Sequence, residues 1–307
     1  MKLSVWMITY NHAPFIREAI ESVLMQQTNF DFELVIGDDC SKDETREILE
    51  SYKNKYPNQI KLLLHPKNLG MMGNMIATLE ACTGTYIAMC EGDDYWIDPL
   101  KLQKQVDFLD QNPDHVLTFH NALLQFDEEP ERQAEIFYSY TKEDYTIEDL
   151  FGDWFIPTAS VVFRNYLIPS YPDWFKASPT GDTPLFTMIA LYGKIKLLPG
   201  VLSVYRHHVG GVTKSIVNYS FWERLYKVYD ALDHYTHYKY SKNIRTMKSS
   251  IYYNLAQAAL IKKDKGQLRL SVYKLLRLRP KNLFAIKYFK ISVIALAPKL
   301  YYLAKSV

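Results

Sequence analysis

The stretch Ile87-Ala-Met-Cys-Glu-Gly-Asp-Asp-Tyr-Trp96 joins a short apolar run to a cluster of three carboxylates. The run from 86 to 90 is typical of a buried strand. The carboxylates of Glu91, Asp93 and Asp94 follow at once, around a glycine that lets the backbone turn. Because like charges repel, a hard divalent cation with oxygen ligands would hold such a turn together. The stretch by itself fits a metal site and a solvated acidic turn equally well.

Apolar runs and helical periodicity alternate along the first part of the chain. We expect strands at 3–8, 32–36, 60–64 and 86–90, separated by helices at 15–27, 44–56 and 74–81. This alternation predicts a doubly wound α/β fold with a mostly parallel central sheet, and ligands of such folds bind beyond the carboxyl ends of the strands. One rim should therefore carry the segments that follow the strands: Thr9–Asn11, Asp38–Asp39, Asn68–Gly70 and Glu91–Asp94.

The later part of the chain continues this pattern and then changes to helices. We expect a helix at 99–109, strands at 115–126 and 160–164, a buried helix at 183–192, and one or two strands in 195–204. The acidic residues 127–149 favour a loop or flap, and 171–181 indicates a connection rich in Pro and Gly. From 219 onward the sequence is helix-compatible, and its expected breaks are Gly266, Pro280 and Pro298. We place one helix-turn-helix pair in 251–283, and a boundary near 217 between an α/β domain (1–217) and a basic helical region (218–307).

The composition is that of an ordinary globular protein, with 307 residues, 48% hydrophobic and 23% charged. The three cysteines, Cys40, Cys82 and Cys90, form no CxxC pair, which favours a reducing compartment. No cleavable signal opens the sequence, and no apolar run reaches the roughly 18 residues that span a bilayer. We expect a cytoplasmic protein, which would lie peripherally on the inner face of the plasma membrane if its basic region binds lipid.

Positive charge is concentrated at the end of the chain. Residues 239–307 contain 16 Lys and Arg and one acid, Asp264, although the whole chain carries a net charge of +2. This asymmetry suggests docking on an anionic membrane surface, where a lipid-linked acceptor would be at hand. The alternative is a pair of amphipathic helices that pack on the rest of the chain with solvated lysines. A nucleic acid partner is not expected, because no recognition motif accompanies the charge.

Three groups of polar residues could carry chemistry. Asp38 and Asp39 end a buried strand, and capping the next helix needs only one acid, so the other could accept hydrogen bonds from a ribose or a base. Asp182 precedes an apolar helix, where it suits either an N-cap or a general base facing the rim. Arg206 and His208 could offer positive charge to a polyphosphate or a nitrogen ligand to a metal, or could be structural.

Several common enzyme motifs are absent from the sequence. It has no GxxxxGK[ST] phosphate loop, which argues against kinases and ATPases of that type. It has no GxGxxG after the first strand and no GxSxG, which argues against dinucleotide dehydrogenases and α/β serine hydrolases.

Residues 2–217 resemble the family 2 glycosyltransferases of the GT-A fold. The segments that carry this resemblance are Ser4–Asn11, Leu34–Thr45, Asn68–Gly70, Glu91–Asp94 and Tyr205–Val212. Each segment is weak alone, but together and in this order they form a specific match. The resemblance implies an inverting enzyme of the bacterial cell-surface polysaccharide type. It would transfer a sugar from a nucleotide diphosphate sugar to a hydroxyl of a glycan or lipid-linked acceptor. We expect the donor to be a UDP-sugar.

The resemblance also implies roles for individual residues. Contacts to the nucleotide sugar would come from Thr9, Tyr10, Asn11, Asp38, Asp39, Asn68, Gly70, Asp93 and Arg206. A DXD element that binds Mn²⁺ or Mg²⁺ is matched by Glu91-Gly92-Asp93, with Glu in place of the first Asp. Its implied metal ligands are Asp94, then Asp93, with Glu91 and the late histidine His208. Asp182 matches the general base that takes a proton from the acceptor hydroxyl.

Two other functions are compatible with the same acidic site. A nucleotidyltransferase would release pyrophosphate from a nucleoside triphosphate at a similar metal centre. The second is a catalytically inactive module that binds sugar nucleotides, with the basic region carrying the function of the protein. Glu91 at the first DXD position, in place of Asp, is compatible with this function. The presence of both Asp94 and Asp182 argues against the inactive module.

Overall fold

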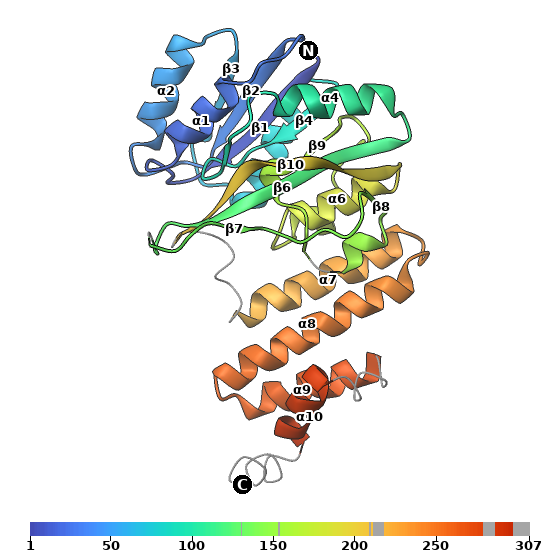
Figure 1. Cartoon of the computed structure of the whole chain (residues 1–307). Helices are drawn as coiled ribbons and strands as arrows, with labels where there is room; N and C mark the ends of the chain where they lie inside the picture. Colours follow the sequence, from blue (N-terminus) through green and yellow to red (C-terminus); the bar gives the residue numbers. More distant parts are fainter. Residues whose placement is uncertain (130, 153, 209, 211–217, 279–285, 297–307) are drawn as a thin grey trace. The chain divides into compact units, whose positions relative to one another are not determined.

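The computed structural model describes residues 1–129, 131–152, 154–208, 210, 218–278 and 286–296 (Figure 1). The chain divides into two compact units, of which the first comprises Met1–Lys176 and Thr180–Val209. The second comprises Ala177–Pro179 and Gly210–Val307. The boundary that the sequence predicts near residue 217 lies outside the described residues.

The first unit is an α/β structure built on one mixed sheet. Its strands are β1 (Leu3–Thr9), β2 (Phe32–Asp38), β3 (Ile60–Leu64), β4 (Tyr86–Met89), β5 (Tyr95–Trp96), β6 (His115–Phe126), β7 (Glu135–Ile136), β8 (Asp144–Tyr145), β9 (Val162–Arg164) and β10 (Lys194–His207). Its helices are α1 (Ile16–Leu24), α2 (Thr45–Lys55), α3 (Met71–Ala81), α4 (Lys101–Gln111), α5 (Asp173–Lys176) and α6 (Asp182–Ala190), with 3₁₀ turns η1 (Asp149–Phe151) and η2 (Thr158–Ser160).

The strand order is β3-β2-β1-β4-β9-β6-β10-β5, with β7 paired to β6 and β8 to β10. The pairs β3–β2, β2–β1 and β1–β4 are parallel, and so is the pair β6–β10. Strand β9 runs antiparallel between β4 and β6. The pairing of Thr9 with Asp38, and of Asp38 with Leu64, brings β1, β2 and β3 to an end at the same edge. The predicted mostly parallel α/β sheet is therefore confirmed.

The core forms where the helices lay their apolar stripes on this sheet. On α1, the buried stripe is Ile16, Ala19, Ile20 and Val23, as its helical spacing predicts. On α4, the stripe from Leu102 to Leu109 is buried in the same way. Full burial of each aliphatic side chain of this size stabilises the fold by about 1.5–3 kcal/mol. These helices therefore hold the sheet rigid beneath the rim where its strands end.

Three segments of the first unit differ in detail from expectation. Strand β10 runs through Pro199 and Gly200 without stopping, because the pairing with β6 shifts register between Leu197 and Val201. The expected loop at 127–149 contains β7 and β8, which pair with the sheet. The expected connection at 171–181 contains α5, whose Phe175 is fully buried.

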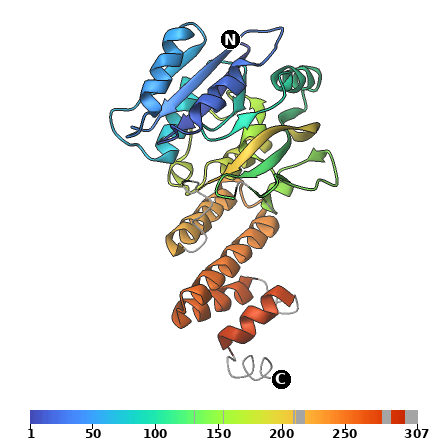
Figure 2. The same ribbon diagram turned by 60° about the vertical axis from the view of Figure 1, so that its left-hand side comes forward.

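The second unit consists of helices packed side by side (Figure 2). They are α7 (Tyr219–Tyr235), α8 (Ser241–Ile261), α9 (Lys265–Leu278) and α10 (Ile286–Leu296). The predicted turn between α8 and α9 is present, and the Oδ1 of Asp264 caps α9 by accepting a hydrogen bond from the N–H of Gln267 at 2.9 Å. A break between α7 and α8 was not expected. It arises where His237 and Tyr238 adopt positive φ, at 49° and 60°, which L-residues rarely sustain in a helix.

None of the helices within the described residues combines the length and the apolar character that crossing a membrane requires.

Candidate active site

The site is built where a tight turn of acidic residues meets the end of β1. This acid turn (residues 91–94) is held by the N–H of Gly92, which donates to the carbonyl oxygen of Ile8 at 2.9 Å. A side chain at position 92 would place its Cβ 2.9 Å from the Cβ of Thr9 and 3.0 Å from the Cδ1 of Ile16. Only glycine allows this approach, and it presses the carboxylates against the loop that follows β1.

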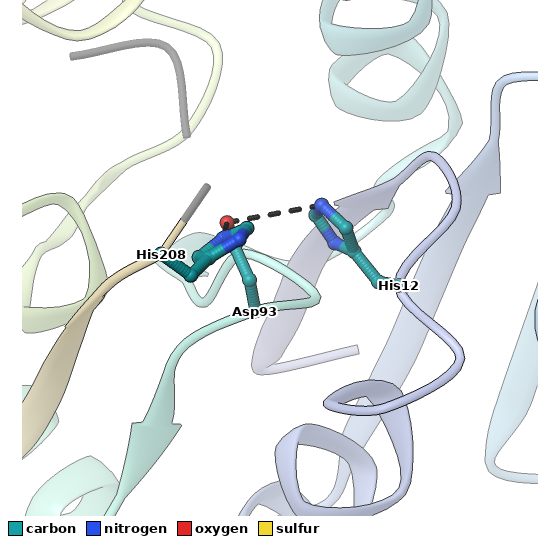
Figure 3. Close-up of side chains that lie close together, drawn as sticks. All are labelled: His12, Asp93 and His208. Carbon is teal, nitrogen blue, oxygen red and sulfur yellow. Dashed lines mark hydrogen bonds and ion pairs between the residues drawn. The ribbon is translucent and has the colours of Figure 1, made fainter. Parts of the chain in front are cut away.

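Three side chains that could ligate a metal ion lie close together at the acid turn (Figure 3). The carboxylate Oδ2 of Asp93 lies 3.0 Å from Nε2 of His208 and 3.8 Å from Nε2 of His12. One ligand atom from each residue lies within 4.8 Å of the other two, which is the spacing of ligands around one cation. We call these residues the His12–Asp93–His208 cluster. They come from the loop after β1, from the acid turn and from the residue that follows β10.

The protonation states in this cluster suit a cation. Burial alone would raise the pKa of Asp93, but the neighbouring His12 and His208 hold it below its ordinary value, so the carboxylate stays charged. Burial lowers the pKa of His12, which favours the neutral imidazole that ligates metals. Within the described part of the chain, the buried Nδ1 of His12 has no hydrogen-bond partner. The donor set therefore fits a divalent ion, with two imidazoles and one carboxylate.

Asp94 and Glu91 occupy different environments from Asp93. Asp94 is 1% exposed, and its Oδ1 accepts a hydrogen bond from the backbone N–H of Arg206 at 2.9 Å. Burial, and then the charge of Asp93, raises the pKa of Asp94 well above its ordinary value. Burial also raises the pKa of Glu91, with further contributions from Asp93, Asp94 and Asp182. Neither side chain belongs to the His12–Asp93–His208 cluster.

Arg206 secures the acid turn from the end of β10. Its guanidinium donates to the backbone oxygen of Asp93 at 2.8 Å and forms an ion pair with Glu18. The guanidinium also lies 4.4 Å from the ring centre of Tyr95, and the residue is only 7% exposed. Its charge is therefore engaged by protein groups, and its main contacts hold the backbone of the turn in place.

The two acids at the end of β2 separate into two roles. Asp38 is fully buried, and its Oδ2 accepts from the Nε of Arg46 at 2.6 Å and from the N–H of Ser41 at 3.1 Å. Asp38 therefore stabilises the turn after β2 and forms an ion pair with Arg46. Asp39 instead ties β2 to the loop after β3, because its Oδ1 accepts from the N–H of Leu69 at 2.6 Å and its backbone oxygen from the side chain of Asn68 at 3.1 Å.

The other predicted rim residues lie beside these acids. Asn11 has a positive φ of 55°, and its Oδ1 accepts from the N–H of Lys42 at 2.8 Å. Tyr10 is 43% exposed, whereas Thr9 is buried. Gly70 precedes α3 with a φ of 76°, and a Cβ there would meet no atom within 4 Å. The carboxyl ends of β1, β2 and β3 thus present an open, polar edge.

Asp182 is the first residue of α6, and Gly181 precedes it at the N-cap position. Its Oδ2 accepts a hydrogen bond from the indole Nε1–H of Trp154 at 2.8 Å. Burial raises the pKa of Asp182, while hydrogen bonds from the Thr183 N–H and from Trp154 oppose that rise. The charge of Asp182 also contributes to the raised pKa of Glu91, after burial, Asp93 and Asp94. The carboxylates of Glu91 and Asp182 are therefore near enough to interact electrostatically.

Two residues of this site were not expected from the sequence. His12 directly follows the predicted segment Thr9–Asn11, so the rule that ligands bind beyond strand ends could have included it. Trp154 lies between two 3₁₀ turns, and no local pattern marks it as a neighbour of Asp182.

Comparisons with known proteins agree with this architecture. The family model described as glycosyl transferase family 2 matches residues 4–168. An uncharacterized protein of Mycobacterium tuberculosis, Rv1520, is 37% identical over 223 residues, which are 72% of this chain and 64% of that protein. The chain thus spans less than two thirds of the length of this relative.

Solved structures share the fold at low sequence identity. The structure of Staphylococcus aureus TarS 1–349 in complex with UDP-GlcNAc gives a TM-score of 0.67 at 17% identity, covering 95% of this chain and 87% of that one. The mannosyltransferase PcManGT of Pyrobaculum calidifontis, in complex with GDP-Man and Mn²⁺, gives 0.56 at 17% identity, covering 97% and 88%. These likenesses identify the GT-A fold. Because the family model covers more than half of the chain and the same segments build the rim, the chain belongs to glycosyl transferase family 2.

Proposed function

We propose that this protein transfers a sugar from a nucleotide diphosphate sugar to an acceptor hydroxyl, with inversion at the anomeric carbon. The observation that carries the proposal is the His12–Asp93–His208 cluster at the acid turn, together with Asp182, whose charge acts on Glu91 of that turn. A transferase of this kind needs a base for the acceptor and positive charge for the leaving diphosphate. A retaining glycosidase would instead need an acid and a nucleophile on either side of the sugar.

The nucleotide would lie along the edge formed by Thr9–Asn11 and by Asp39 with its loop. Asp39 can hold a base or ribose with the oxygen that Leu69 does not use, and Asn68 and Gly70 shape the edge beside it. Asp38 is better assigned to structure, because Arg46 and Ser41 occupy its Oδ2. We infer a UDP-sugar as the donor. The fold neighbour TarS, whose structure contains UDP-GlcNAc, supports that choice.

The metal would be held by His12, Asp93 and His208. Two imidazole ligands favour Mn²⁺ over Mg²⁺, which prefers oxygen. When bound, the ion supplies Lewis acidity that neutralises charge on the leaving diphosphate. Arg206 positions the acid turn through its contact with the backbone of Asp93, and the Oδ1 of Asp94 accepts a hydrogen bond from the backbone N–H of Arg206. We therefore assign metal ligation to Asp93 rather than to Asp94 or Glu91.

Asp182 would act as the general base. It takes the proton of the acceptor hydroxyl while the acceptor oxygen bonds to the anomeric carbon. The bond from that carbon to the diphosphate oxygen breaks at the same time, and its electron pair leaves with the diphosphate. One displacement of this kind inverts the anomeric centre, and it uses one carboxylate only.

A direct test incubates the protein with a panel of UDP- and GDP-sugars, with and without Mn²⁺, and measures nucleotide diphosphate release. We expect metal-dependent release from one donor, and a glycosidic product of opposite anomeric configuration by NMR. Pyrophosphate release from nucleoside triphosphates, with no turnover of any sugar nucleotide, would assign the site to nucleotidyl transfer instead.

Replacing His208 tests the metal site. His208→Ala should weaken Mn²⁺ binding, measured by isothermal titration calorimetry, by about tenfold to a hundredfold, because one of three ligands is lost. His207→Ala is the matched control. Its ring packs on Phe126, at 5.7 Å between ring centres, and it lies outside the cluster. Equal Mn²⁺ affinity in the two variants would remove His208 from the ligand set.

We further propose that the second unit docks on an anionic membrane surface, which would bring a lipid-linked acceptor to the enzyme. One face of α9 exposes Leu270 (45%) and Tyr273 (60%), and the exposed cations Lys274 and Arg277 each lie one helical turn further along the same helix. Apolar and cationic groups on one helical face are the chemistry of an interfacial helix.

Liposome flotation tests this docking. The full chain should float with vesicles that contain phosphatidylserine. With vesicles of neutral lipid, it should remain unbound at the bottom of the gradient. The double variant Lys274→Glu/Arg277→Glu should float several-fold less, since each cation near an anionic surface contributes about 1 kcal/mol. The matched control reverses two exposed lysines of the first unit, Lys55 and Lys176. Identical flotation of both double variants would contradict a role for α9.

A further inference from the structure

Trp154 combines two features that rarely occur together. Its indole N–H donates to the Oδ2 of Asp182 at 2.8 Å, yet 43% of the residue surface is exposed. A hydrogen-bonded tryptophan in a structural role normally buries its rings as well, because the apolar surface is the larger part of the side chain. Here the polar edge holds a carboxylate and the apolar part is left accessible beside it.

Two further aromatic rings support the indole. Phe137 lies 5.0 Å from Trp154 and Tyr205 lies 5.7 Å from it, between ring centres, at interplanar angles of 75° and 74°. Phe137 and Tyr205 are themselves 5.8 Å apart. We call Phe137, Trp154 and Tyr205 the aromatic platform. Edge-to-face packing of this kind contributes about 0.5–1.5 kcal/mol per pair beyond burial, so the indole is held in one orientation.

The two rings that support Trp154 stand on the sheet. Tyr205 belongs to β10 and pairs in register with Leu124 of β6. Phe137 directly follows β7, and its N–H donates to the carbonyl oxygen of Ala122 at 2.9 Å. Both supporting rings therefore belong to segments that backbone hydrogen bonds hold in the sheet. A rigid aromatic surface positioned in this way suits recognition of a ligand ring better than it suits packing alone.

We propose that the aromatic platform is the acceptor subsite, on which a pyranose ring of the acceptor stacks, and that Trp154 is also the positioning residue for Asp182. This inference rests on the function proposed above, because it takes Asp182 as the base. The C–H face of a pyranose is apolar and matches an exposed indole, whereas the donor diphosphate requires the polar and charged groups around Asp93. The acceptor hydroxyl, not the donor, must meet Asp182.

The hydrogen bond from Trp154 also orients the Asp182 carboxylate. Trp154 donates to Oδ2, so the carboxylate cannot rotate without losing this contact. The contact fixes the carboxylate rotamer at a cost in basicity, since donation by the indole stabilises the charged form. The apolar face of the indole would stack on the sugar ring, whereas its N–H holds the Asp182 carboxylate. Substitutions of Trp154 can therefore remove one function without the other.

An NMR experiment tests both parts without any turnover. The chain has 5 tryptophans, so its indole ¹H–¹⁵N spectrum is simple, and the Trp154 signal is the one that Trp154→Phe removes. Asp182→Ala should move that signal upfield by loss of the hydrogen bond. Titration with methyl β-D-glucopyranoside and methyl N-acetyl-β-D-glucosaminide should shift it and leave the signal of Trp222, in the second unit, in place. An unmoved signal in Asp182→Ala overturns the positioning role, and an unmoved signal with both glycosides overturns the stacking role.

Kinetics with the donor that turns over then separate the two effects. Trp154→Phe keeps a ring but loses the N–H, so kcat should fall about tenfold with the acceptor KM little changed. Trp154→Leu loses both, and the acceptor KM should also rise about tenfold. Trp222→Phe is the control for folding and should match the wild type. If Asp182→Asn is inactive but Trp154→Phe is fully active, this inference fails and the proposed function stands. If Asp182→Asn is fully active, the proposed function itself fails.

Discussion

Asp182→Asn is expected to lower the rate of sugar transfer by about 10³-fold, within the range that a positioned general base contributes. Asparagine keeps the size of the side chain and can still accept the Trp154 hydrogen bond, but it cannot take a proton. Nucleotide-sugar affinity should stay within about twofold of wild type, because ligand charge at the His12–Asp93–His208 cluster is unchanged. Product formation in single turnover, with donor binding by calorimetry, measures the two quantities separately.

The matched control for this substitution is Asp173→Asn. Asp173 lies on α5 of the same unit, and its side chain is 99% exposed, so its loss should change neither the rate nor the affinity. The pH profile adds a second readout. Because burial raises the pKa of Asp182, the acidic limb of kcat/KM should lie above the ordinary value of 3.8, with activity lost as the pH falls through it. Glu91 interacts electrostatically with Asp182, so the limb can report both carboxylates. Full activity of Asp182→Asn would exclude this residue as the base.

The fold and the rim were predictable because they depend on local patterns. Alternating apolar runs and helical stripes identify the strands and helices, and the parallel connection of β1 to β4 then fixes which ends meet. That reasoning needs no knowledge of side-chain contacts. It correctly predicts that the ends of β1, β2 and β3 share an edge and that α1 and α4 bury their apolar stripes.

The division of labour among the acids was not predictable in the same way. Asp93 and Asp94 are adjacent in sequence, and local chemistry gives no reason to prefer either as a ligand. Their difference comes from Arg206, 112 residues after Asp94, whose backbone N–H fixes Asp94 in a buried position. The same holds for Trp154, which contacts Asp182 although 28 positions separate them in the sequence, with η2, β9 and α5 in between. The roles of Asp93, Asp94 and Trp154 therefore depend on burial and on hydrogen bonds between distant residues, which the residue types alone do not predict.

A second large effect is expected from Asp93→Asn, and its comparison with Asp94→Asn separates the two neighbours. Asp93→Asn removes the only charged ligand of the His12–Asp93–His208 cluster, so Mn²⁺ affinity should fall by about a hundredfold or more. Transfer should fall by about 10³-fold at fixed Mn²⁺, since positive charge at the leaving diphosphate is lost with the ion. Calorimetry of Mn²⁺ binding and nucleotide diphosphate release measure these two losses.

Asp94→Asn should behave differently, although it makes the same chemical change one residue away. Burial and the charge of Asp93 favour the protonated form of Asp94, and asparagine resembles that form in shape and charge. The amide oxygen that this substitution introduces can still accept the N–H of Arg206, so the acid turn keeps its support. We expect Mn²⁺ affinity within about threefold of wild type and a free energy of unfolding changed by less than about 1 kcal/mol. If Asp94→Asn instead abolishes Mn²⁺ binding while Asp93→Asn retains it, the ligand is Asp94, and the cluster around Asp93 is a structural pairing of one carboxylate with two histidines.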